Sequence, residues 1–95
     1  MKQIVIPVDR EQARRVDALG YEVQARKQVI AFYLDRGMDT GTEQFARYQR
    51  EYVEQFVAWE QAKNELEQTC LSGYPDRRRW WLDSGRGEIR LELGP

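Results

Sequence analysis

The stretch GMDTGTE, residues 37–43, separates two long helical patterns and decides the fold. Gly37 suits the left-handed conformation that commonly ends a helix. Thr40 and Glu43 have the spacing of a capping box, which predicts the start of a second helix at about residue 41. Because only about four residues join the two helices, we expect antiparallel neighbours in a helical hairpin.

The helical pattern before this break has a starting signal of its own. Asp9 followed by Gln12 is a capping-box pattern and predicts a helix over residues 10–36. The pattern after the break continues to Leu71, where a glycine and a proline follow, and predicts a helix over residues 41–71. Each helix should therefore be about 40 Å long.

Short strands flank the hairpin on both sides in the sequence. Residues 2–8 predict one strand, and residues 79–93 predict a β-hairpin with alternating apolar side chains. An antiparallel helical hairpin brings the start of its first helix close to the end of its second. We therefore predict a small antiparallel sheet at that end, in an α+β fold with residues 1–95 as a single domain.

Composition and charge narrow the class of protein. The chain has 95 residues, of which 41% are hydrophobic and 33% charged, and its net charge is -1. This composition predicts one folded domain and argues against a protein that coats duplex nucleic acid. No apolar run reaches the length of a membrane span or a secretory core, and a single cysteine allows no internal disulfide. We expect a cytoplasmic protein with no membrane partner.

The first helix carries apolar residues on two opposite sides. One stripe has the spacing of a face packed on another helix and consists of Val16, Leu19, Val23, Ile30 and Leu34. The opposite stripe consists of Ala18, Tyr21, Ala25, Val29 and Phe32. A partner helix within the hairpin can cover only one of them.

The second helix poses the same problem. One side is formed by Phe45, Tyr48, Tyr52, Phe56, Trp59, Ala62, Leu66 and Cys70, and an adjoining flank by Ala46, Val53 and Val57. Each large apolar side chain left in water forfeits about 1.5–3 kcal/mol. We therefore predict a homo-oligomer whose interface consists of Ala18, Tyr21, Ala25, Val29, Phe32, Val53 and Val57. The alternatives are that the sheet folds back over this surface, that its members are ordinary scattered surface residues, or that a different protein covers it.

The sequence offers little catalytic chemistry. It contains no histidine, which removes the commonest general base and most zinc sites. Cys70 lies on the apolar side of the second helix near its C-terminus, where the helix dipole disfavours a thiolate. Acidic residues on the helices lie four positions from basic ones, as on solvated helix faces. We expect no enzyme activity, no metal site and no cofactor.

One cluster of side chains could bind a ligand. It comprises Arg77, Arg78, Arg79, Trp80 and Trp81, with Arg86 and Arg90 able to approach across the β-hairpin. Arginine provides forked donors for phosphate, and tryptophan provides a surface on which a base can stack. Two alternatives remain. A tryptophan could fill the core while the arginines pair with nearby acids, or the cluster could contact a partner protein.

The leading functional hypothesis is a non-catalytic, homo-oligomeric protein that sequesters or senses a small phosphate-bearing ligand, such as a nucleotide, through this cluster. The runner-up is a protein-interaction or assembly adaptor that uses its two-faced helices, and an origin in a phage or mobile element fits a small protein of this type. Single-stranded nucleic acid is the weakest hypothesis, because the second helix is acidic.

Overall fold

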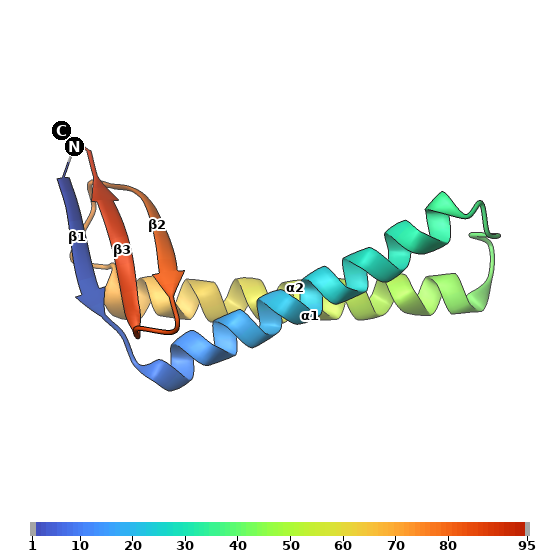
Figure 1. Cartoon of the computed structure of the whole chain (residues 1–95), viewed down its shortest axis with the longest axis horizontal. Coiled ribbons are helices and arrows are strands. Elements are labelled where there is room, and N and C mark those ends of the chain that lie inside the picture. Colours follow the sequence, from blue (N-terminus) through green and yellow to red (C-terminus); the bar gives the residue numbers. More distant parts are fainter. Residues whose placement is uncertain (1, 95) are drawn as a thin grey trace. The chain divides into compact units, whose positions relative to one another are not determined.

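The computed structural model describes residues 2–94. Its elements, in chain order, are β1 (Lys2–Pro7), α1 (Arg10–Asp35), α2 (Glu43–Cys70), β2 (Arg77–Asp83) and β3 (Glu88–Leu93). The fold is α+β, with two long helices and an antiparallel sheet made of the N-terminal strand and the C-terminal hairpin (Figure 1). The predicted fold class is therefore confirmed.

The ends of α1 follow the sequence signals closely. The Asp9 carboxylate accepts a hydrogen bond from the backbone N–H of Gln12 at 3.4 Å, so Asp9 caps a helix that begins at Arg10. At the other end Gly37 has a φ of 64°, and Met38 N–H donates to the carbonyl of Tyr33. This pattern is a Schellman motif, in which glycine adopts the left-handed conformation without strain.

The start of α2 differs from the prediction. The helix begins at Glu43 and not at residue 41, and Thr42 caps it in place of Thr40. The Thr42 hydroxyl accepts from Phe45 N–H at 3.2 Å, whereas the Asp39 carboxylate accepts from Gly41 N–H at 2.8 Å. The turn that Asp39 closes uses the residues up to Gly41, so the helix can begin only after it.

The chain divides into two compact units. Unit 1 consists of Met1–Asp17 and Ala62–Pro95, and unit 2 consists of Ala18–Gln61. Unit 1 therefore holds the sheet, the first turns of α1 and the last turns of α2, while unit 2 holds the remainder of both helices and their connection. Folding of residues 1–95 as one domain stays a prediction.

The sheet of unit 1 has the order β1-β3-β2, so β3 pairs on both sides. In the antiparallel register, Leu91 lies opposite Ile4 on β1 and Trp80 on β2, while the adjacent Arg90 lies opposite Val5 and Trp81. Neighbouring residues of a strand point to opposite faces. One face, here called the inner face, therefore carries the apolar row, and the other, here called the open sheet face, carries Arg90 and its neighbours.

Strand β2 begins earlier than predicted. It starts at Arg77 rather than Arg79, and its register with β3 shifts between these two residues. Arg78 is the extra residue of this β-bulge. A bulge changes which face the following side chains occupy, and alternation in the sequence alone does not reveal it.

The core of unit 1 joins the inner face to the helices. Ile89 and Leu91 are fully buried in it, as are Leu66 and Leu71 from the end of α2. Burial of each such side chain contributes about 1.5–3 kcal/mol. The Trp80 indole N–H donates to the Glu67 carboxylate at 2.9 Å, which satisfies its polar atom beside this core.

Unit 2 is held together by aromatic contacts between its helices. Tyr33 is buried, its ring lies 5.1 Å from that of Phe45, and its hydroxyl donates to the carbonyl of Asp39. Leu34, predicted to face α2, is exposed instead. An α-helix drifts by about 20° against each seven-residue repeat, so the buried side moves from the Leu34 position to the Tyr33 position.

Candidate functional site

The seven residues of the predicted arginine and tryptophan cluster do not share one surface. Arg77 pairs in register with Leu93 on the inner side, whereas Arg79 pairs with Glu92 on the open sheet face. Trp80 and Trp81, adjacent in the sequence, likewise point to opposite faces. The structure therefore brings Arg79, Trp81 and Arg90 together and separates them from the other four.

Arg77 and Trp80 bond within their own unit. The Arg77 guanidinium donates to the carbonyls of Leu71 at 3.3 Å and Tyr74 at 3.1 Å, just after the end of α2. Both carbonyls also accept a backbone N–H, so the guanidinium adds a second donor to each of them. Trp80 is held by its bond to Glu67, as described above. Both residues have structural partners that a ligand would have to replace.

Arg78 and Arg86 lie at the two ends of the hairpin. Arg78 is exposed in the bulge. Arg86 belongs to the turn before β3, where its guanidinium lies 3.8 Å from the Asp83 carboxylate and its backbone N–H donates to the same side chain at 3.1 Å. Arg86 thus closes its own turn and does not join the open sheet face.

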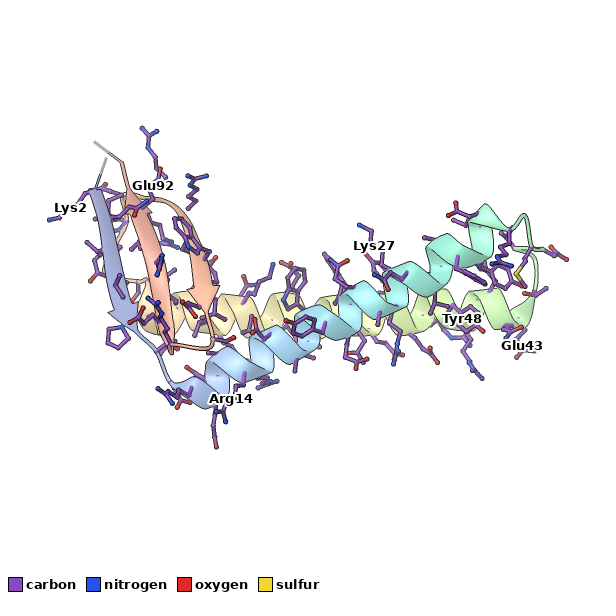
Figure 2. All side chains as sticks on the ribbon, viewed as in Figure 1. Lys2, Arg14, Lys27, Glu43, Tyr48 and Glu92 are labelled. Atoms are coloured by element: carbon purple, nitrogen blue, oxygen red, sulfur yellow. The ribbon has the colours of Figure 1, made fainter. Side chains whose placement is uncertain are left out.

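The open sheet face combines an exposed indole with charged side chains. Trp81 is 39% exposed, and the Arg79 guanidinium carbon lies 5.6 Å from its ring centroid, within the range of a cation–π contact. Arg90 lies opposite Trp81, and Val5 lies on the other side of Arg90. Glu92, which is labelled in Figure 2, lies on β3 opposite Arg79. Sequence analysis missed Val5, because β1 lies far from the cluster in the chain.

Charge on the open sheet face is largely compensated. The Arg79 guanidinium donates to the Glu92 carboxylate at 2.9 Å, and Glu92 is only 7% exposed. A phosphate near Arg79 would therefore compete with a nearly buried carboxylate. The Arg90 Nε, in contrast, is buried and has no hydrogen-bond partner. Arg90 is therefore the cation of this face that could donate to an anionic group.

The second candidate surface lies on α1 in unit 2. All five residues of its outward side are exposed, with Tyr21 at 75% and Phe32 at 55%. We call this set, Ala18, Tyr21, Ala25, Val29 and Phe32, the outer stripe. Val23 and Tyr33 on the other side of the same helix are buried. The stripe has the spacing of a packed helix face, yet all five residues remain exposed. The Arg36 guanidinium carbon lies 4.3 Å from the Phe32 ring centroid, at one end of the stripe.

Helix α2 has exposed apolar residues as well. Val53 is 55% and Val57 48% exposed, and a shallow hollow of about 440 Å³ lies beside Val53, where Arg50 and Glu54 also line it. Three large residues that sequence analysis did not assign to an interface are also exposed, namely Leu34, Met38 and Phe56. Leu34 lies in the last turn of α1, Met38 in the helix connection and Phe56 in α2.

Other chemistry is sparse in residues 2–94. No group of three acidic, cysteine or histidine side chains within this range is placed to hold a metal ion. Burial raises the pKa of the Cys70 thiol above its ordinary value, which makes it a poorer nucleophile at neutral pH. Within the same range, neither helix has an apolar segment suited to crossing a bilayer.

Comparison with models of protein families, with curated proteins and with solved structures gave no match.

Proposed function

We propose that this chain is a non-catalytic interaction protein that works as a homo-oligomer, assembled through the outer stripe of α1. The observation that carries the proposal is that every residue of a stripe with the spacing of a buried helix face is exposed. Monomeric proteins rarely leave such a contiguous apolar surface in water. Self-association is the simplest way to cover it, because the partner is always present at the same concentration as the chain.

Measuring the molar mass of the purified protein by light scattering tests this proposal. The wild type should be an oligomer, and replacement of both Val29 and Phe32 with aspartate should yield a monomer, because each new charge would have to be buried. Gln24→Asp is the matched control, since Gln24 is exposed on the same helix outside the stripe. Circular dichroism should show that all three proteins keep their helices. A monomeric wild type would overturn the proposal.

A second candidate function is the binding of a small anion, such as a nucleotide, on the open sheet face. The unsatisfied Arg90 Nε beside Trp81 favours it, because a phosphate oxygen could accept from the guanidinium while a base stacks on the indole. The pairing of Arg79 with Glu92 weighs against a highly charged ligand. This function is compatible with self-association, since the two surfaces belong to different units.

Thermal unfolding in the presence of nucleoside mono-, di- and triphosphates tests the second candidate. Bound ligand raises the unfolding temperature, and Arg90→Ala should abolish that rise while Arg86→Ala should leave it intact. The comparison is matched because the Arg86 side chain lies in the turn, away from Trp81. If stabilisation is equal in both variants, the ligand does not use Arg90.

A further inference from the structure

The outer stripe is symmetric in sequence about its central residue. Ala18 and Phe32 lie seven positions before and after Ala25, and Tyr21 and Val29 lie four positions before and after it. All five residues are exposed on one continuous helix within unit 2. This symmetry bears on which molecule can cover the stripe and in which direction.

We propose that the partner of the outer stripe is the same stripe of a second copy, packed antiparallel about a twofold axis beside Ala25. This inference rests on the proposed self-association and adds its direction and register. In an antiparallel pair, a residue before Ala25 is level with the residue equally far after Ala25 in the partner. Phe32 is then level with Ala18, and Tyr21 is level with Val29.

Side-chain volumes fit this arrangement. Phe32 is level with the smaller Ala18 and Tyr21 with the smaller Val29, so no level sets two aromatic rings against each other. At the axis, Ala25 meets its own copy, and two small side chains let helices approach to the shorter end of their usual 8–10 Å spacing, at about 8 Å. A parallel pair would instead set Phe32 against Phe32 and Ala18 against Ala18, which combines crowding with a void.

The five residues of the stripe are uncharged, and the charges lie beside or beyond them. The flanking Glu22 is paired with Arg26 on the same helix at 3.4 Å, and the Arg36 guanidinium carbon lies 4.3 Å from the Phe32 ring centroid. An antiparallel pair also places the helix dipoles in opposition, which is favourable, whereas a parallel pair would align them.

The exposed area is of the right order for a dimer. Tyr21 and Phe32 are 75% and 55% exposed. These two side chains alone offer on the order of 250 Å², which is about a third of the area that each partner buries in a standard interface. The smaller stripe residues and the polar side chains beside them can supply the remainder. A second copy presents the same apolar spacing, which an unrelated partner would have to provide by its own sequence.

Single cysteines introduced into the full chain test the register. In a Cys70→Ser background, Ala25→Cys places two thiols at the twofold axis, where the Cα atoms of closely packed helices come within disulfide range. Ala18→Cys places its two thiols about 21 Å apart along an antiparallel pair. Ala31→Cys is the matched control, because Ala31 is an exposed alanine of α1 that lies about 120° around the helix from Ala25.

Mild oxidation followed by non-reducing electrophoresis gives the readout, and light scattering on the reduced variants shows whether the oligomer persists. We expect Ala25→Cys to form the covalent dimer at least about tenfold faster than Ala18→Cys or Ala31→Cys. Equal rates at positions 18 and 25 would indicate a parallel pair and overturn the inference. An oligomer with no preference for position 25 would overturn the register alone, and a monomer would overturn the proposed self-association as well.

Discussion

Unit 1 and unit 2 bury their apolar side chains to very different degrees. In unit 1 the inner face of the sheet and the end of α2 enclose Leu66, Leu71, Ile89 and Leu91 almost completely. In unit 2 the buried apolar residues of α1 and α2 are few, while Tyr21 and Phe32 are largely exposed. A sheet and two helix ends form enough layers to enclose a core, whereas two helices alone leave both outer sides in water. Unit 1 therefore encloses a core within one chain, whereas unit 2 leaves the apolar surface on which the proposed self-association rests.

The largest effect should come from removing part of the unit 1 core. Leu91→Ala should lower the free energy of unfolding by about 2–5 kcal/mol, because it leaves a cavity at a fully buried position. Val5→Ala is the control, since Val5 belongs to the same sheet but is 56% exposed. Urea denaturation followed by circular dichroism gives both values. Similar losses in the two variants would contradict the assignment of inner and open faces.

Self-association should stabilise unit 2 more than unit 1. At a concentration about a hundredfold above the dissociation constant of the assembly, association adds about 2.7 kcal/mol to the stability of the associated form. Hydrogen exchange should therefore slow with protein concentration for amides of unit 2, such as those between Tyr21 and Phe32, and change less in β3. Phe32→Asp should remove the concentration dependence. Uniform slowing throughout the chain would show that the units open together.

A smaller effect distinguishes the two threonines at the start of α2. Thr42→Ala should cost about 1 kcal/mol, because it removes the acceptor for the Phe45 N–H, whereas Thr40→Ala should be nearly neutral. Thermal unfolding of the two variants, matched in chemistry and two positions apart, measures the difference. The opposite ranking would restore Thr40 as the cap.

The smallest effect concerns Cys70 in unit 1. Since burial raises its thiol pKa, the folded protein should hold less thiolate at pH 8 than the unfolded chain and react more slowly with iodoacetamide. The neutral thiol's contribution to stability is fully present below the ordinary thiol pKa and is lost as the pH rises through the raised value. Comparing alkylation rates with and without urea tests the direction. Faster reaction in the folded state would contradict it.

The helical hairpin and the strands could be predicted because their signals are local. Asp9 caps α1 and Gly37 ends it, as their sequence context indicates. Thr40 and Thr42 are both acceptable caps by sequence, and the choice depends on the turn that Asp39 closes. Tyr33 rather than Leu34 is buried, because the buried side of α1 drifts gradually along the helix. In both cases neighbouring residues are equally acceptable by sequence, and tertiary contacts decide between them.

The candidate site was only partly predictable for a similar reason. Alternation along a strand already implies that Trp80 and Trp81 point to opposite faces. The bulge at Arg78 decides which face each arginine joins, and it leaves no sequence signal. The pairing of Arg79 with Glu92 depends on strand register. The exposure of the outer stripe, in contrast, was predictable, because a hairpin of two helices cannot cover two opposite sides of either one.

The order of strands in the sheet has a consequence for biosynthesis. The central strand, β3, follows both helices in the chain, so β1 has no neighbour to pair with until β3 has been made. The helices emerge from the ribosome well before it. We expect the hairpin to form on the nascent chain while the sheet is still open. Neighbouring ribosomes on one message would then carry exposed outer stripes side by side, which would favour pairing of newly made copies over capture by other proteins.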